Sequence, residues 1–246
     1  MWRRSRWLQR PPNPHLIHAW HILGIVALTG YANVVANRFL DSFWYIPFNL
    51  AIVGVAIAIA RHAGVTWVDM GMWPERFGKG LKIGGVVMAI IGAGVLIGVA
   101  LPVTREFFHD DRVIDASTWL VLFNALIRIP IATAFYEEML FRGVLFGMFA
   151  RKWPPLWAGL ASSLLFGLWH ILPTIETLDT NPAGDLFNGV AGLVVAALGA
   201  VVGTAIVGLG FLWLRLRANS TIAPILAHIA TNSFALLAAL FVVRAL

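Results

Sequence analysis

Three ionisable side chains lie close together in a stretch that is otherwise apolar. Residues 135–143 read Phe-Tyr-Glu-Glu-Met-Leu-Phe-Arg-Gly, with acids at Glu137 and Glu138 and a base at Arg142. Glu138 and Arg142 are four positions apart, so in a helix they share one face and form an ion pair. Glu137 is rotated by about 100° from Glu138, and the same arginine serves it less well. The spacing predicts one carboxylate that is structurally paired and one that is available for chemistry.

Two further apolar stretches each carry a histidine with a partner four positions away. Phe166 precedes His170, and His228 precedes Asn232. Each pair falls on one helix face. Taken singly, each histidine is equally well explained by a hydrogen bond between helices. Taken with Glu137, they offer a carboxylate, two imidazoles and an amide, which together can activate water and stabilise an oxyanion.

The composition indicates that these groups are surrounded by lipid. Of the 246 residues, 59% are hydrophobic and 12% are charged, whereas a soluble domain carries about 25% charged residues. An ionisable group at hydrocarbon depth costs a few kcal/mol or more, so it needs a partner, a wet cavity or a function. The chain has no cysteine, which excludes a disulfide scaffold, a thiolate metal site and a cysteine nucleophile.

We expect an all-α polytopic membrane protein with about seven transmembrane helices in one bundle. A span takes about 20 residues to cross about 30 Å of hydrocarbon. Seven stretches qualify: 16–37, 43–60, 83–103, 119–150, 156–172, 186–214 and 222–243. The fourth is too long for one straight span and contains Pro130, which predicts a kink or a break.

Basic residues concentrate on one side of this layout, the side that faces the cytoplasm under the positive-inside rule. The twelve on that side are Arg3, Arg4, Arg6, Arg10, Arg61, Arg76, Lys79, Lys82, Arg151, Lys152, Arg215 and Arg217. The asymmetry predicts a cytoplasmic N-terminus. Helix orientation and attraction to anionic lipid explain the basic face better than RNA or DNA does, so no nucleic-acid partner is expected.

We interpret residues 1–246 as a single transmembrane domain. Residues 1–15 are a basic cytoplasmic tail. Residues 61–82 mix tryptophan with charge and are expected to lie as a cytoplasmic loop on the lipid headgroups. Residues 117–246 hold all three motifs and form the expected catalytic core.

The depth of the polar groups decides whether they can meet. Counted along each helix from the nearest basic residue or turn on the cytoplasmic side, Glu138, His170 and His228 lie about 20, 22 and 16 Å deep. These depths are similar within the error of the helix count. The side chains are therefore predicted to share one layer inside the bundle.

The three motifs, in this order on separate spans, resemble the CAAX protease and bacteriocin-processing family, also called CPBP or Abi. They stand here as Glu137-Glu138-x-x-x-Arg142, Phe166-x-x-x-His170 and His228-x-x-x-Asn232. The resemblance implies an intramembrane endopeptidase, related to the type II CAAX prenyl proteases, that hydrolyses membrane proteins or peptides. It also implies a lipid bilayer and such a substrate as partners, and a prokaryotic cell membrane as location.

The resemblance also implies a role for each motif residue. Glu137 is the general base that activates water, assisted by His170. His228 and Asn232 stabilise the tetrahedral oxyanion. The residues implied to support the site are Glu138, Arg142 and Phe166.

The cofactor does not follow from the resemblance, because the family has been described both as metalloproteases and as glutamate-dependent proteases without metal. Zinc takes about three protein ligands and one open position, which Glu137, His170 and His228 could supply. No His-Glu-x-x-His helix occurs, and a glutamate that binds metal is unavailable as base unless Glu138 takes over that role. We favour a mechanism without cofactor and keep zinc as the alternative.

Two other functions remain open. Carboxylates and imidazoles inside a membrane also build ion pathways, so an ion- or proton-coupled transporter is one alternative. Against it, no inverted repeat is evident between the two halves. The other is a non-catalytic immunity or scaffold protein of the same family, which an assay for peptide hydrolysis separates from the enzyme.

Overall fold

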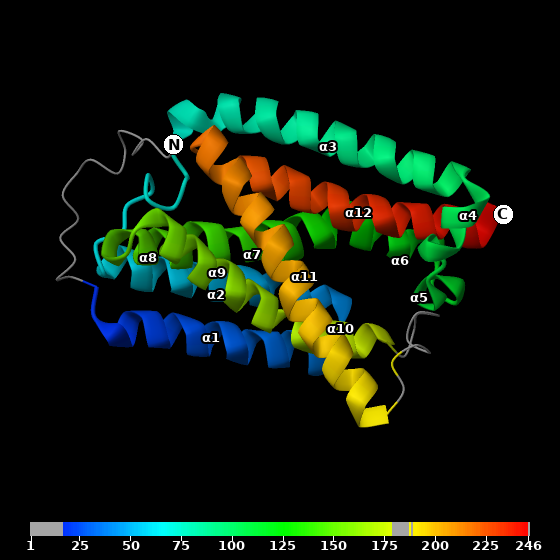
Figure 1. Cartoon of the computed structure of the whole chain (residues 1–246), viewed down its shortest axis with the longest axis horizontal. Helices are drawn as coiled ribbons and strands as arrows, with labels where there is room; N and C mark the ends of the chain where they lie inside the picture. Colours follow the sequence, from blue (N-terminus) through cyan, green and yellow to red (C-terminus); the bar gives the residue numbers. More distant parts are fainter. Residues whose placement is uncertain (1–16, 179–186, 188, 246) are drawn as a thin grey trace.

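Long helices make up the described part of the chain, as Figure 1 shows. A computed structural model describes residues 17–178, 187 and 189–245, which form helices and connecting turns with no strand. Seven helical stretches are long and apolar enough to cross a membrane, which confirms the expected number. The expected tail at residues 1–15 lies outside the described residues, as do the first residues of the first and sixth expected spans, 16 and 186.

The helices follow the expected order with small shifts at their ends. They are α1 (Ala19–Arg38), α2 (Ser42–His62), α3 (Phe77–Ala100), the composite fourth span from α6 (Thr118–Phe123) to α8 (Phe146–Lys152), α9 (Pro155–Trp169) with α10 (Ile171–Leu178), α11 (Gly189–Ala218) and α12 (Ile222–Ala245). Two short helices, α4 (Pro102–Arg105) and α5 (Asp111–Ile114), join the third span to the fourth. Helix α12 packs along α3, and α11 packs on α9. Figure 1 shows α11 crossing the other helices obliquely.

The fourth span is helical throughout but changes helix type. After α6 it becomes a π-helix (η5, Asn124–Phe135), then the α-turn α7 (Tyr136–Glu138), a second π-helix (η6, Met139–Leu145) and finally α8. Pro130 lies inside the first π-helix, so the irregularity expected there is a wider helix instead of a break. Proline cannot donate in the backbone ladder, so a carbonyl one turn before Pro130 loses its helical partner. Separately, Asn49 of α2 donates to the Ala132 carbonyl at 2.9 Å and ties α2 to this span. Short π-helical stretches frequently mark functional sites.

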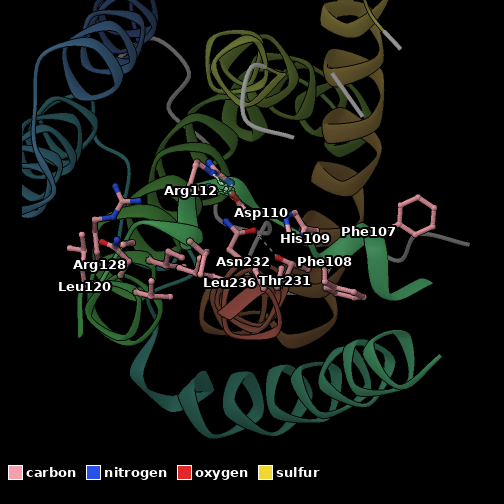
Figure 2. Close-up of a pocket in the computed structure, with 17 residues that line it drawn as sticks. Phe107, Phe108, His109, Asp110, Arg112, Leu120, Arg128, Thr231, Asn232 and Leu236 are labelled. Carbon is pink, nitrogen blue, oxygen red and sulfur yellow. Dashed lines mark hydrogen bonds and ion pairs between the residues drawn. The ribbon is translucent and has the colours of Figure 1, made fainter. Parts of the chain in front are cut away.

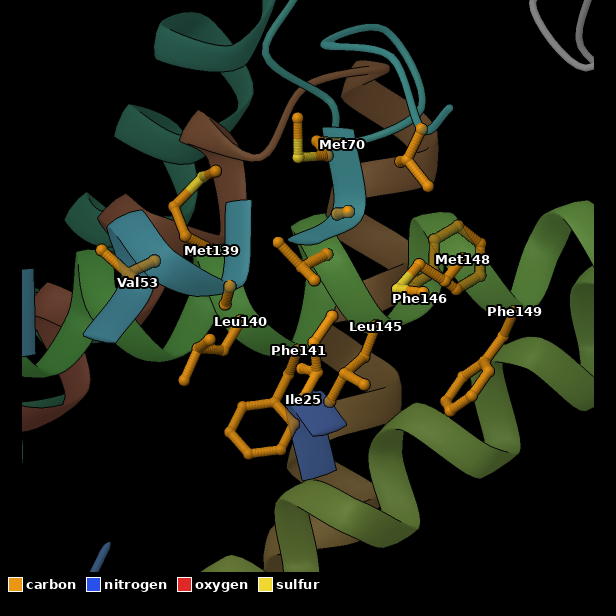
Figure 3. Packing of buried hydrophobic residues seen from close by; sticks show 14 of the residues in the cluster. Ile25, Val53, Met70, Met139, Leu140, Phe141, Leu145, Phe146, Met148 and Phe149 are labelled. Carbon is orange, nitrogen blue, oxygen red and sulfur yellow. The ribbon is translucent and has the colours of Figure 1, made fainter. Parts of the chain in front are cut away.

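The core lies around the second half of this span. Met139, Phe141 and Phe146 are at most 1% exposed, and Figure 3 shows their side chains interleaved with neighbouring apolar ones. Two hydrogen bonds tie α9 to this core. The Ser162 hydroxyl donates to the Phe141 carbonyl at 2.6 Å, and the Asn33 amide of α1 donates to the Trp169 carbonyl at 2.8 Å. These bonds fix the end of α9, where His170 follows.

The connection between α2 and α3 is shorter than residues 61–82, because α2 continues to His62 and a 3-10 turn starts at Pro74. Its middle packs into the bundle, since Met70 is completely buried, and Figure 3 shows Met70 beside the fourth span. The Thr221 hydroxyl, at the start of α12, donates to the Met70 carbonyl at 2.7 Å. Gly71 has φ +73° and lies against Thr221, where a side chain would collide with the hydroxyl.

Candidate active site

Glu137 faces the interior of the bundle, where two histidines approach it. Its side chain is 2% exposed. Its Oε2 atom lies 3.8 Å from Nε2 of His170 and 3.8 Å from Nε2 of His228. This oxygen is buried and has no hydrogen-bond partner among the described residues. The fourth, fifth and seventh spans therefore bring together the groups that the similar depths predict.

Glu138 forms the predicted ion pair. Nη1 of Arg142 donates to Oε1 of Glu138 at 3.0 Å, and both side chains are at most 1% exposed. Nδ1 of His228 lies 3.0 Å from the same oxygen. That second contact was not foreseen from the sequence. It places Glu138 behind His228, where the carboxylate orients the imidazole.

The hydrogen-bond partners of the two histidines fix which ring nitrogen faces Glu137. Nδ1 of His170 lies 2.8 Å from the carbonyl oxygen of Phe166. Because a carbonyl only accepts, this Nδ1 carries the proton, and Nε2 of a neutral ring presents a lone pair. Nδ1 of His228 faces the carboxylate paired with arginine, so the same reasoning applies. Three acceptor atoms thus converge, an arrangement that suits a ligand with two donor hydrogens, such as water.

Aromatic rings pack against the Glu138–Arg142 ion pair and against both histidines. The Arg142 guanidinium lies 3.9 Å from the ring centroid of Phe166, and that ring lies 4.4 Å from the His170 ring. Phe211 of α11 stacks on the His228 ring, with centroids 5.1 Å apart. Phe166 therefore contacts the support pair and a histidine together, as its proposed supporting role requires.

Helix α11 contributes two residues that the sequence analysis missed, Phe211 and Gly208. A Cβ atom at Gly208 would lie 2.8 Å from Nη2 of Arg142 and 3.2 Å from the Phe166 ring. Glycine thus lets α11 approach the ion pair closely. The only signal in the sequence was a glycine three positions before an aromatic residue on an apolar helix, a spacing too common to single out.

Asn232 lies one turn of α12 beyond His228 and lines a cavity of about 480 Å³. Figure 2 shows it in this cavity, close to Thr231 and Asp110. The Thr231 hydroxyl lies 2.8 Å from the His228 carbonyl and 3.3 Å from Oδ1 of Asn232. Among the described residues no hydrogen bond joins Asn232 to Glu137 or to either histidine ring. The structure brings the other six motif residues into one cluster and leaves Asn232 at its edge.

Glu137, His170 and His228 are also the side chains that would bind zinc if the site held a metal. Zinc binds nitrogen and oxygen at about 2.0–2.2 Å, which brings tetrahedral ligand atoms to within about 3.4 Å of one another. Both separations from Oε2 of Glu137 are 3.8 Å, wider than that. The described ranges hold no group of three or more His, Cys, Asp or Glu side chains arranged for a metal ion. Zinc binding by Glu137, His170 and His228 would therefore require each histidine Nε2 to move closer to Oε2 of Glu137.

The comparison with family models matches residues 117–234 to the type II CAAX prenyl endopeptidase Rce1-like family. The chain carries an Rce1-like domain. This confirms the resemblance argued from the motifs, and all seven motif residues fall inside the matched range. The similarity of residues 117–234 to this family suggests a protease. No curated protein and no solved structure matches the chain.

Proposed function

We propose that this multi-pass membrane protein is an intramembrane endopeptidase in which Glu137 activates the water that attacks the peptide bond. The observation that carries the proposal is the convergence of one unpaired buried carboxylate oxygen with two imidazole Nε2 atoms. Membrane proteins or peptides are the substrate class. The N-terminus is placed in the cytoplasm of a prokaryotic cell on the charge asymmetry and on the family resemblance.

In the proposed reaction, water binds between Oε2 of Glu137 and Nε2 of His170. Glu137 takes a proton from it as the oxygen attacks the scissile carbonyl, and the protonated acid then donates to the leaving amine. His170 is held by the Phe166 carbonyl, so its Nε2 orients the water without a change of tautomer. Positioned base catalysis of this kind typically contributes about 10²–10⁴-fold.

The oxyanion then needs donors, for which we propose His228 and Asn232. Nδ1 of His228 donates to Glu138, so for Nε2 to donate to the oxyanion the ring must first take up a second proton from solvent. That proton is shared with the oxyanion and returns to solvent when the products leave, and the Glu138 carboxylate lies beside the ring while it is charged. Oδ1 of Asn232 faces the Thr231 hydroxyl, which leaves the amide hydrogens for the substrate. Loss of one oxyanion donor costs about 10²–10³-fold in kcat in other hydrolases.

Glu137→Gln tests the proposal. The amide keeps the shape of the side chain but cannot accept the proton, so cleavage is expected to fall by at least 10²-fold while the protein stays folded in the membrane. Glu176→Gln is the matched control, because Glu176 pairs with Arg38 on the outside of the bundle. Peptides that accumulate in membranes of the Glu137→Gln strain, identified by mass spectrometry, reveal the substrates.

Three outcomes contradict the proposal. Full proteolysis by Glu137→Gln removes the base assignment. Proton-coupled uptake into vesicles without hydrolysis supports a transporter, and hydrolysis by neither protein supports a scaffold. A metal requirement is tested separately: activity that survives 1,10-phenanthroline, with no stoichiometric zinc by mass spectrometry, agrees with the metal-free mechanism. Loss of activity that added zinc restores would overturn it.

A further inference from the structure

The cavity that Asn232 lines adjoins the candidate active site at the end of the bundle where α4 and α5 lie (Figures 1 and 2). Its walls come from η5, α12 and the connection between the third and fourth spans. Because Asn232 is one helical turn from His228, the cavity begins where the polar cluster ends. A volume of about 480 Å³ falls in the usual range for ligand pockets, about 300–1,000 Å³.

One cation in this cavity has no anionic partner. Asp110 and Arg112 satisfy each other, since Nη2 of Arg112 donates to Oδ2 of Asp110 at 2.7 Å. Arg128 forms no ion pair or hydrogen bond within the described ranges, and its Nε is buried without a partner. Its one contact of note is the Tyr45 ring, 4.7 Å from the guanidinium carbon. The neighbouring Asn124 has a buried Oδ1 that is also without a partner.

The opposite end of the bundle is closed by the connection between α2 and α3. Met70 fills the space beside the fourth span, and backbone oxygens next to it accept hydrogen bonds from two other helices. The Met70 carbonyl binds the Thr221 hydroxyl, and the Asp69 carbonyl accepts from Nη2 of Arg215. Nε of Arg151 also lies 3.4 Å from the Asp69 carboxylate. The cavity lies at the other end of the bundle, and Asn232 is the motif residue that lines it.

We propose that Arg128 binds a carboxylate of the peptide substrate and thereby sets the distance from that carboxylate to the cleaved bond. This inference rests on the proposed peptidase function. Arg128 is half-buried and lines the cavity, so a ligand in the cavity can reach its guanidinium, and bidentate pairing with carboxylate is the strongest mode of binding for that group. In a peptide, the anion is either the terminal α-carboxylate or the side chain of aspartate or glutamate. Both sources present the same chemistry to Arg128.

The helix geometry sets the spacing. Arg128 and Glu137 are nine residues apart on one helical span. Nine residues of α-helix rise about 13 Å, and because most of this stretch is π-helix, which is wider and rises less per residue, about 13 Å is an upper bound. An extended peptide covers about 3.3 Å per residue, so the carboxylate is expected no more than about four residues from the bond that Glu137 attacks.

Binding is measured on the full chain carrying Glu137→Gln, in nanodiscs of neutral phosphatidylcholine, so that no peptide is consumed. The probe is a fluorescent apolar hexapeptide of alanine and leucine in three forms: the free acid, the C-terminal amide, and the amide with aspartate at the last position. We expect the two anionic forms to bind about 10- to 100-fold more tightly than the neutral amide. Arg128→Gln should abolish this preference, and Arg128→Lys should retain part of it.

Arg217→Gln is the matched control, because Arg217 is exposed and its contact of note is likewise one aromatic ring, Trp213 at 5.7 Å. It should leave the preference unchanged. For a peptide that wild type cleaves, Arg128→Gln should raise KM for the anionic form with little change in kcat. Moving the carboxylate to eight residues from the bond should lower kcat/KM.

The inference is overturned if the Glu137→Gln protein binds the free-acid peptide and the C-terminal amide with equal affinity. It is also overturned if a folded Arg128→Gln protein still prefers the anionic peptides. Binding of phosphatidylglycerol that depends on Arg128, with no preference among peptides, assigns the arginine to lipid phosphate and also overturns it. The proposed function fails separately: if wild type hydrolyses no peptide yet binds the anionic forms through Arg128, the carboxylate site stands and the peptidase does not.

Discussion

Removal of the Arg142 guanidinium is expected to destabilise the fold as well as abolish activity. The side chain is 1% exposed, and its Nη1 is 3.0 Å from Oε1 of Glu138. Arg142→Ala leaves this carboxylate buried without its cation. Breaking a buried ion pair by removing one partner costs about 3–5 kcal/mol. The lost contact with the Phe166 ring at 3.9 Å acts in the same direction, by about 2 kcal/mol for a desolvated pair.

The double variant Glu138→Gln with Arg142→Met separates charge from packing. It removes both charges and keeps similar volumes, and buried ion pairs replaced in this way are often as stable or more stable. The glutamine that replaces Glu138 would still present an amide oxygen to His228. We therefore expect the double variant to recover most of the stability that Arg142→Ala loses while remaining inactive, because the orienting charge behind His228 is gone.

Stability is measured in detergent by heating aliquots and quantifying the monodisperse peak by size-exclusion chromatography. For a chain of this length, about 1 kcal/mol shifts Tm by about 2–4 °C, so Arg142→Ala should lower Tm by at least about 10 °C and reduce the folded yield. An Arg142→Ala protein with wild-type yield and a Tm within about 2 °C would refute the view that this pair supports the fold.

Three further predictions address packing and surface charge. Gly208→Ala should lower activity at least tenfold by displacing the guanidinium, whereas Gly203→Ala, with nothing within 4 Å of the new Cβ, should not. Gly71→Ala should lower Tm by several degrees, because φ is +73° and the Cβ would overlap the Thr221 hydroxyl. Partial burial opposes ionisation of Asp110, but hydrogen bonding to Arg112 outweighs it and lowers the pKa of Asp110. This partly exposed pair stabilises the fold by under about 1 kcal/mol. The stabilisation is present above the unfolded-state pKa of Asp110, near 3.8, and is lost as the pH falls below it. The difference in stability between wild type and Asp110→Asn should therefore shrink as pH falls from 6 to 3.

The seven spans could be predicted because one physical requirement dominates them. A segment in lipid must satisfy its backbone internally and be apolar over about 20 residues, and both properties are local to the sequence. The ends of the spans were less predictable. Basic and aromatic residues are compatible both with a helix and with a loop at the interface, so they did not reveal that α3 starts at Phe77, six residues before the expected start of the span. Pro74, at the first position of the turn that leads into α3, was the local signal, because proline is favoured there.

The polar cluster could be predicted from spacing and depth, but its surroundings could not. Rotation on a helix gives the pairing of Glu138 with Arg142, and depth brings the histidines to the same layer. The position of α11 depends on the tertiary packing of apolar faces, so neither Gly208 nor Phe211 could be connected with the site. The burial of Met70 depends on hydrogen bonds from distant helices, which a composition of mixed charge and tryptophan does not reveal.

The contrast between two adjacent glutamates links the fold to the proposed chemistry. Oε1 of Glu138 is within 3.0 Å of both an arginine and a histidine nitrogen, so its negative charge is compensated and held in place. Within the described part of the chain, the polar atoms that approach Oε2 of Glu137 are two histidine nitrogens at 3.8 Å, and these present lone pairs. For Glu137 and Glu138 to exchange surroundings, the short α7 turn would have to rotate by about 100° about the helix axis. The π-helices on either side, η5 and η6, would then have to change their twist. The helix backbone, more than the residue type, therefore determines which carboxylate is structural and which can accept a proton.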